Sequence, residues 1–240
     1  MEHAEFLGTV FDLQETLQTT ILRNNPEKPG EDRQGGMFVA LLQEVGEMLQ
    51  EWQGFKFWKQ NPQPRTKENI VCTTCDGSGD ENWPSSLERL IEGGSANEYL
   101  KCEDCNGTGS LGDRNPLLEE TADVLHMFAD VAIYRGYRPD HFYYDRMILV
   151  QMSSELFGIR VDGKAEEVND GILNLYYMIA FAGKHDTREY KPRESEEHFR
   201  AAFLGFLGLA KYVFGFNDEQ LLQAYRDKHL INMRRQKNGY

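Results

Sequence analysis

The sequence lacks any long apolar segment. No stretch approaches the roughly 20 consecutive apolar residues that a membrane-spanning helix needs. The first ten residues, MEHAEFLGTV, show no basic region followed by an apolar run of the kind found in signal peptides. We therefore expect a cytoplasmic protein that does not bind a membrane. Its 240 residues can form one sizeable core, or a core with a small satellite.

Positive charge is also scarce. The chain has 26 Lys and Arg residues against 39 Asp and Glu residues, a formal net charge of −13. Binding to a nucleic-acid backbone depends on clustered Lys and Arg, so we expect no nucleic-acid partner. An acidic protein that handles phosphates usually needs a divalent cation between its carboxylates and the substrate.

Only four cysteines are present, and they occur as two pairs. Both pairs have the pattern C-x-x-C-x-G-x-G, as Cys72-TT-Cys75-DGSG and Cys102-ED-Cys105-NGTG. In a cytosolic chain such pairs indicate a metal site rather than disulfide bonds. The repeat resembles the zinc repeat of J-domain chaperones, although the J-domain itself is absent. Four thiolates are enough for one closed tetrahedral Zn²⁺ site, whose function would be structural because no coordination position stays open.

Helical periodicity dominates the rest of the chain. From about residue 60 to 115 the character changes, because Pro, Gly, Asn and Ser residues surround the cysteines. We predict an all-α domain formed by residues 1–60 and 115–240, interrupted by a loop-rich insertion at 61–114. No strand alternation of convincing length is found. The predicted helices cover residues 3–24, 37–59, 117–135, 140–158, 165–183, 195–215 and 218–236.

Two predicted helices carry pairs of acidic residues three positions apart. The first has Glu44 and Glu47, with Glu51 one turn further on, and taken alone these acids are typical of a solvated face. The second has Glu120 and Asp123, which point into the apolar stripe of their helix. An unpaired buried carboxylate is costly. Together the two pairs favour a site for a hard divalent cation with oxygen ligands.

The last predicted helix brings basic residues to its apolar side. Lys228, Asn232 and Arg235 occupy positions i, i+4 and i+7 of one stripe. Basic residues in a last helical turn are common because they complement the helix dipole, which explains Arg234 and Lys237. The dipole does not explain the alignment of Lys228 and Arg235 with apolar positions. That alignment is expected if a polyphosphate and a metal lie between these cations and the carboxylates.

This ordered set of motifs resembles the dimeric all-α dUTPases, relatives of the MazG-type nucleotide pyrophosphohydrolases. The family pattern has E-x-x-E on one helix, E-x-x-D on another and a terminal K-x-x-x-N-x-x-R-Q-x-N-G-Y. The chain also has LQETLQ at 13–18 and FKFWK at 55–59. The resemblance covers about residues 5–60 and 115–240. It implies a MazG-like helical bundle that acts as a homodimer and hydrolyses dUTP, a small deoxynucleoside triphosphate, to dUMP and pyrophosphate.

The resemblance also implies residue roles. Glu44, Glu47, Glu120 and Asp123 would bind two or three Mg²⁺ ions and carry the catalysis, with Glu47 orienting the attacking water. The basic residues would neutralise the phosphates, Asn232 and Gln14 would recognise the uracil and the deoxyribose, and Trp58 would form a wall of the pocket. The implied substrate-binding residues are Gln14, Lys56, Trp58, Lys59, Lys228, Asn232, Arg235 and Asn238.

Other functions stay open. Hydrolysis of dCTP, or of both dCTP and dUTP, is the nearest alternative. A non-catalytic, zinc-dependent interaction protein on a degenerate nucleotide-binding fold is an alternative of another class, although all four acids and the terminal motif are present. Nucleic-acid binding by the cysteine module is disfavoured, because residues 69–110 contain eight acidic and only two basic residues.

Overall fold

The computed structural model describes residues 3–143, 146–158, 167–184 and 192–239. The chain forms two compact units. Unit 1 comprises residues Met1–Pro64 and Leu117–Tyr240, and unit 2 comprises Arg65–Pro116.

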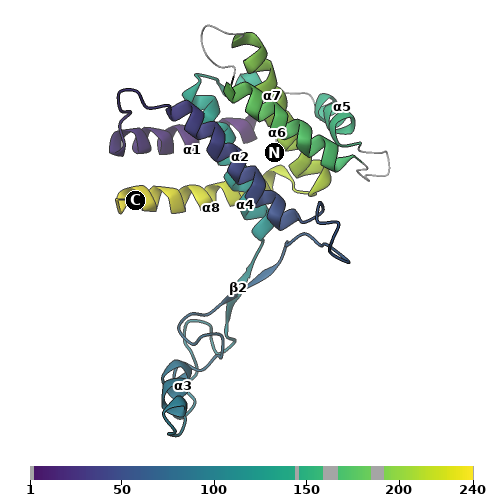
Figure 1. Ribbon diagram of the computed structural model, residues 1–240. Coiled ribbons are helices and arrows are strands. Elements are labelled where there is room, and N and C mark those ends of the chain that lie inside the picture. The colour runs from purple at the N-terminus through teal and green to yellow at the C-terminus, as the bar shows by residue number, and fades with distance from the viewer. Residues whose placement is uncertain (1–2, 144–145, 159–166, 185–191, 240) are drawn as a thin grey trace. The chain divides into compact units, whose positions relative to one another are not determined.

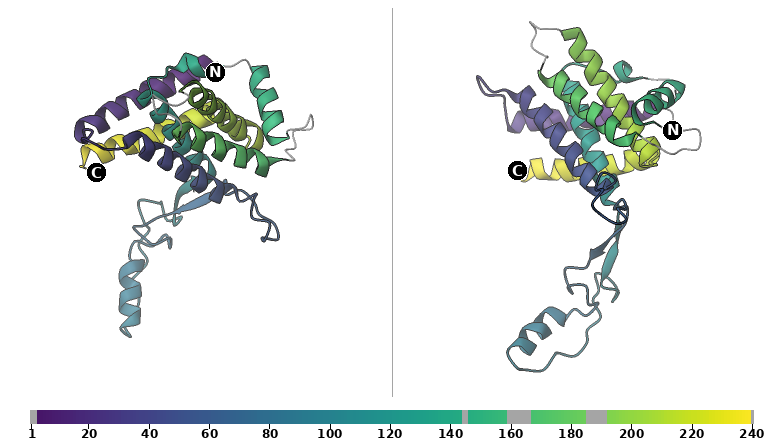
Figure 2. Two further views of the ribbon diagram at one scale, coloured as in Figure 1. Left: turned by 45° about the horizontal axis from the view of Figure 1, so that its top comes forward. Right: turned by 45° about the vertical axis from the view of Figure 1, so that its right-hand side comes forward.

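Helices dominate the part of the chain that the structure describes, and the predicted all-α class is confirmed. Figure 1 shows α6 beside α7 and α1 beside α8, and Figure 2 shows these pairs from two other directions. No single described helix is long and apolar enough to cross a membrane. One bent pair of helices, Arg193–Val213 with Asp218–Lys237, meets the criteria for a membrane span by length and composition only. The α-helices outside unit 2 are α1 (His3–Asn24), α2 (Arg33–Trp52), α4 (Pro116–Tyr134), α5 (Arg146–Phe157), α6 (Val168–Lys184), α7 (Pro192–Gly208) and α8 (Asp218–Lys237).

Aromatic side chains fill the core between α4 and α7. Phe128 of α4 stacks against Phe203 and Phe206 of α7, at ring-centroid distances of 5.0 and 5.3 Å. Phe142, from the 3₁₀ turn Pro139–Phe142, packs against Phe203 at 4.7 Å. Burying one such side chain stabilises the fold by about 1.5–3 kcal/mol. This core holds α4 in place, and α4 carries the Glu120-x-x-Asp123 pair.

The predicted helix 37–59 is wrong at both ends. The helix begins at Arg33, because the side chain of Asp32 accepts a hydrogen bond from the Gly35 N–H and caps it. It ends at Trp52, because Gln53 adopts a left-handed conformation with φ 61° and its N–H bonds to the Leu49 carbonyl. The FKFWK segment therefore follows α2 and is not part of it.

The other predicted helices need smaller corrections. Predicted segment 140–158 divides into the 3₁₀ turn and α5, and predicted segment 195–215 ends in the π-helical turn Leu209–Val213 after α7. Residue 165, where the next predicted helix begins, lies outside the described residues. The last helix is capped by Asn217, whose side chain accepts a hydrogen bond from the Gln220 N–H.

Unit 2 contains more regular structure than the predicted loop-rich insertion. Strands β1 (Glu68–Val71) and β2 (Ser110–Arg114) pair antiparallel, and helix α3 spans Trp83–Ile91. The Glu68 carboxylate accepts hydrogen bonds from Arg65 and Arg114. The bond to Arg114 joins β1 to β2 at the end of the strand pair. Both strands are short and mostly exposed, so they lack the alternation by which a strand is recognised.

Candidate functional site

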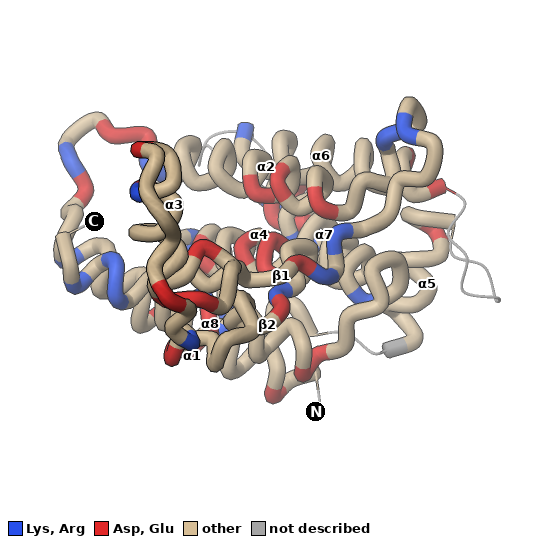
Figure 3. Tube along the Cα trace, turned by 90° about the horizontal axis from the view of Figure 1, so that it is seen from below, with Lys and Arg blue, Asp and Glu red and all other residues tan. Residues whose placement is uncertain are grey.

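Three carboxylates converge between α2 and α4. Glu44, Glu47 and Glu120 each offer one oxygen, and these oxygens lie within 4.8 Å of one another. The i, i+3 spacing places the two α2 acids on one side of their helix. The acidic segments of α2 and α4 lie next to each other in Figure 3. Glu47 is exposed, whereas Glu44 and Glu120 are partly buried, so the cluster is open to a ligand on one side.

The electrostatics of this cluster are unfavourable without a cation. Burial, followed by the charges of Asp123, Glu47 and Glu120, raises the pKa of Glu44 to about 7. Burial, followed by the charge of Asp123, also raises the pKa of Glu120. Three oxygens this close repel one another as long as they are ionised. A hard divalent cation with oxygen ligands, such as Mg²⁺, fits both the donor set and its excess negative charge.

Asp123 stands apart from the three converging oxygens. It is buried on α4, and its carboxylate forms an ion pair with the Lys228 ammonium group of α8. Burial raises the pKa of Asp123, while the hydrogen bond and charge of Lys228 and the charge of Arg235 lower it. The basic stripe of α8 therefore acts electrostatically on the acidic residues of α4.

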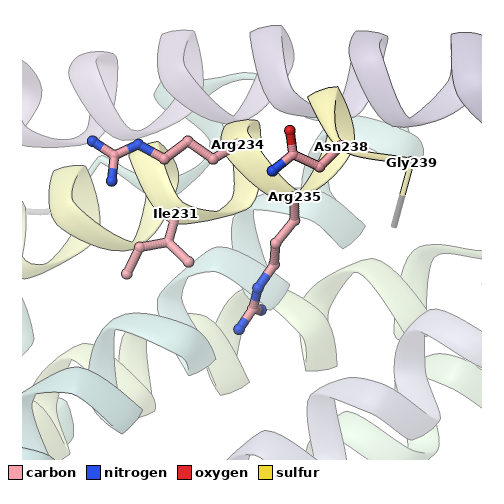
Figure 4. Close-up of a pocket in the computed structure, with 5 residues that line it drawn as sticks. All are labelled: Ile231, Arg234, Arg235, Asn238 and Gly239. Atoms are coloured by element: carbon pink, nitrogen blue, oxygen red, sulfur yellow. The ribbon is translucent and has the colours of Figure 1, made fainter. Parts of the chain in front are cut away.

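The C-terminal part of α8 borders an open hollow of about 510 Å³. The side chains of Arg234 and Arg235 point to different sides of the helix (Figure 4). A guanidinium N–H of Arg235 donates a hydrogen bond to Asn232 Oδ1 at 3.5 Å. The Arg235 guanidinium group, beside this hollow and close to Asn232, suits phosphate oxygens. The lining residues are Ile231, Arg234, Arg235, Asn238 and Gly239.

The structure places Lys56, Trp58 and Lys59 in the segment after α2. Lys56 Nζ donates to the Gln50 carbonyl at 3.2 Å, and Lys59 Nζ donates to Gln53 Oε1 at 2.6 Å. The Trp58 side chain is 62 % exposed. Both lysines thus bind groups at the C-terminal end of α2, whereas Glu47 lies five residues before that end.

Gln14, a predicted base contact, lies in the interior. It is 2 % exposed, and its amide oxygen accepts a hydrogen bond from the Tyr225 hydroxyl at 2.8 Å. Its amide nitrogen donates to Asp130 Oδ1 at 2.9 Å. Sequence reasoning did not identify Asp130 or its neighbour His126. Polar residues at positions 126 and 130, within the otherwise apolar second half of α4, were the available signal.

Glu51, one turn after Glu47 in the sequence, is a further acid to which the sequence motifs assign no role. The negative charge of Glu51 contributes to the raised pKa of Glu120. Glu51 is half-buried near the C-terminal end of α2. Its position one turn beyond Glu47 extends the acidic surface along α2.

Unit 2 contains a separate cluster formed by the four cysteines. All four are buried, and the Sγ–Sγ distances are 3.8 Å for Cys72–Cys102 and 3.7 Å for Cys75–Cys105. A disulfide needs about 2.05 Å, so these are free thiols. Four sulfurs around Zn²⁺ at about 2.3 Å form a tetrahedron with edges of about 3.8 Å. The two measured Sγ–Sγ distances match these edges, and all four sulfurs lie within 4.8 Å of one another, so the cluster fits a zinc ion.

Backbone groups support the cluster symmetrically. The N–H of Gly79 donates to Cys75 Sγ, and that of Gly109 donates to Cys105 Sγ, each at 3.2 Å. Both glycines have positive φ, and a Cβ at Gly79 would lie 2.3 Å from the Gly107 carbonyl oxygen. Only glycine fits this close crossing of the two repeats.

One comparison with known proteins found a match, which covers most of unit 1. A protein family model described as dUTPase matches residues 7–77 and 108–240. The match includes both acid pairs and α8, and it leaves out residues 78–107. No curated protein and no solved structure shows significant similarity to the chain.

Proposed function

The chain belongs to the dUTPase family, and on that premise we propose that it hydrolyses dUTP to dUMP and pyrophosphate with Mg²⁺ as cofactor. Membership of this family indicates nucleotide pyrophosphohydrolase activity. The observation that carries the finer proposal is the convergence of three carboxylate oxygens from α2 and α4 within 4.8 Å. The neighbouring ion pair of Asp123 and Lys228 adds a cation to the same surface.

The carboxylates hold the cofactor and direct the water. Glu44, Glu47 and Glu120 would bind Mg²⁺, with Asp123 joining them when Lys228 turns to a phosphate. Bound Mg²⁺ supplies positive charge to the phosphates and lowers the pKa of water. Glu47, the most exposed of these acids, would accept a hydrogen bond from the attacking water. The water oxygen bonds to the α-phosphorus, the bond from that phosphorus to the α–β bridging oxygen breaks, and pyrophosphate leaves. Glu47 would take up the proton that the water loses and pass it to solvent.

The α8 residues bind the rest of the substrate in this proposal. Lys228 and Arg235 would stabilise the charge that develops on the phosphate oxygens. Asn232 would hydrogen-bond to the uracil or the deoxyribose, and Asn238 would contact the substrate from the edge of the hollow. Trp58, with its largely exposed ring, would form an apolar wall, and Lys56 and Lys59 would add positive charge.

Hydrolysis of dCTP is the second candidate. Uracil offers an acceptor at position 4 and cytosine offers a donor, and an amide such as that of Asn232 can satisfy either by turning over. We therefore expect dUTP to be the preferred substrate, with measurable turnover of dCTP.

A panel of deoxynucleoside triphosphates tests the proposal. Purified protein is incubated with Mg²⁺ and each of dUTP, dCTP, dTTP, dATP and dGTP, and released pyrophosphate is measured. The highest kcat/KM is expected for dUTP. Absence of pyrophosphate release from all five would favour the non-catalytic, zinc-dependent interaction protein instead.

Two features complete the proposal. One Zn²⁺ ion binds Cys72, Cys75, Cys102 and Cys105. Its role is to stabilise unit 2, because a closed thiolate site leaves no coordination position for a substrate.

The enzyme is a cytoplasmic homodimer, as the resemblance to the dimeric dUTPases implies. Light scattering coupled to size-exclusion chromatography gives the mass that tests the dimer.

A further inference from the structure

The C-terminal end of α8 lies beyond the core of unit 1. The buried residues of α8 are Leu221, Leu222, Tyr225 and His229. After His229, every described residue of the helix is exposed or only partly buried. Arg235, to which we assign a role in phosphate binding, is one of the exposed residues. Packing in the core therefore does little to hold the last turns of α8 in place.

A side chain of α1 reaches the last turn of α8. The two helices lie side by side, and their C-terminal ends are on the same side of unit 1 (Figure 1). Asn24 is the last residue of α1. Its amide nitrogen donates hydrogen bonds to the carbonyl oxygen of Gln236 at 3.1 Å and to Gln236 Oε1 at 3.2 Å. The donor capacity of the Asn24 side chain is thus directed at one residue of α8.

The bond to the carbonyl extends the cap of α8. The last four carbonyl groups of an α-helix have no hydrogen-bond partner within the helix. The Asn238 N–H donates to the carbonyls of Arg234 and Arg235, and Asn24 donates to that of Gln236. Asn24 therefore supplies, from another helix, a partner that the end of α8 does not provide for itself.

Arg235 precedes Gln236 in this turn. It borders the hollow of about 510 Å³, and its side chain extends from the C-terminal part of α8 (Figure 4). Its only contact described above is the long hydrogen bond to Asn232, at 3.5 Å and within the same helix. The direction of the guanidinium group therefore follows the backbone of the last turn, and fraying of that turn moves it away from the hollow.

We infer that Asn24 is a positioning residue, which fixes the last turn of α8 through Gln236 and so keeps Arg235 directed at the substrate phosphates. The inference rests on the proposed function and deepens it. Asn24 acts only through α8, because its amide nitrogen is bonded to Gln236.

The test compares Asn24→Ala and Asn24→Asp with the control Asn25→Ala. Both substitutions at position 24 remove the donor, and Asp keeps the shape of Asn. The hydrogen bonds of Asn25 to Ile21 and Arg33 are formed by its backbone, so Asn25→Ala retains them. Because both positions are exposed, all three variants should have the Tm of the wild type, which circular dichroism measures.

Amide hydrogen exchange tests the cap without any substrate. Residues 234–238 should exchange faster in Asn24→Ala than in Asn25→Ala, whereas residues 221–229 should exchange at the wild-type rate in both. Equal exchange at 234–238 would overturn the inference, and so would faster exchange throughout α8 with a lowered Tm. A wild type that hydrolyses no nucleotide would refute the proposed function and leave this result interpretable.

A double-mutant cycle with Arg235→Ala tests whether Asn24 acts through Arg235. We expect both substitutions of Asn24 to lower kcat/KM for dUTP about five-fold, since one exposed capping interaction is lost, and Asn25→Ala to leave it unchanged. In the Arg235→Ala background, Asn24→Ala should cause no further loss, because the effects of coupled residues are not additive. The same five-fold loss in that background would overturn the inference and indicate that Asn24 contacts the substrate itself.

Discussion

The carboxylate cluster of unit 1 and the cysteine cluster of unit 2 differ in how complete they are. The four thiols are buried, with Sγ–Sγ distances near those of a tetrahedral zinc site and N–H groups directed at two of the sulfurs. Of the three converging carboxylates, Glu47 is exposed and the other two are partly buried, and the pKa of Glu44 rises to about 7 through burial and mutual repulsion. One site is closed around its proposed metal, and the other stays open to a substrate.

The two sites also differ in how far apart their ligands lie along the chain. Each cysteine pair is a local repeat, and two such repeats suffice for the cluster. The carboxylates come from α2 and α4, more than seventy residues apart, and their partner Lys228 comes from α8. A closed structural site is therefore encoded locally, whereas an open site depends on the packing of unit 1.

Removal of one thiol should give the largest effect. In Cys105→Ser, three sulfurs remain around the zinc position, so we expect loss of zinc and unfolding of unit 2. A closed thiolate site contributes about 10 kcal/mol of apparent binding free energy in small zinc domains. Metal analysis by mass spectrometry, with Glu103→Gln as an exposed control in the same loop, measures the loss. Wild-type protein that contains no zinc would contradict the assignment.

Asp123→Asn should nearly abolish activity while the fold is kept. The substitution removes the charge that balances Lys228 and contributes to the metal site, but it preserves shape and relieves repulsion within the acidic cluster. We expect kcat/KM for dUTP to fall by about 1,000-fold or more. Asp227→Asn, an exposed position beside Lys228, is the matched control. Wild-type turnover in Asp123→Asn would show that Asp123 is only a core residue.

Discrimination against thymine should be smaller but measurable. If Trp58 closes against the ring carbon that bears the methyl group of thymine, steric exclusion lowers kcat/KM for dTTP by more than about 100-fold relative to dUTP. Trp58→Ala should narrow that difference, and Tyr177→Ala, at an exposed aromatic of α6, should not. Equal kcat/KM values for dUTP and dTTP in the wild type would indicate a broad-specificity, MazG-like enzyme.

The pH dependence of the metal-free protein should show the smallest effect. The pKa of Glu44 is about 7 in the folded protein and 4.5 in the reference state, so the folded form binds a proton that the unfolded chain has already lost. This contribution to stability is present below pH 4.5 and is lost as the pH rises through 7. We expect the Tm of metal-free protein to fall between pH 5 and about 8, and added Mg²⁺ to offset the fall.

A substitution at the same position sharpens this test. Glu44→Gln should flatten the pH dependence of Tm, whereas Glu15→Gln at an exposed position of α1 should leave it unchanged. A metal-free wild type whose Tm is independent of pH over this range would contradict the electrostatic description of the cluster.

Helix positions could be predicted from the sequence where periodicity and caps agree. The predicted segments 3–24 and 218–236 correspond closely to α1 and α8, because apolar spacing marks both and Asn217 caps the second. The end of α2 could not be predicted, because Gln53 takes a left-handed conformation that usually marks a glycine.

Contacts between helices that are distant in the sequence were harder to predict. The acid pairs were visible as motifs. The Asp123–Lys228 ion pair, however, joins two residues that are 105 positions apart in the sequence, and no local pattern predicts such a contact. The buried contacts of Gln14 could not be predicted from the sequence for a related reason. A glutamine on a helix is usually solvated, and its burial follows only from the packing of α1 against α8.

The products of dUTP hydrolysis test the central proposal most directly. Wild-type protein is incubated with dUTP and Mg²⁺, and the products are identified by ³¹P NMR, with the Asp123→Asn variant as a control. If the carboxylates of α2 and α4 act as proposed, the wild type forms dUMP and pyrophosphate only when Mg²⁺ is present. Formation of dUDP and orthophosphate, or equal turnover without a divalent cation, would contradict the proposed active site.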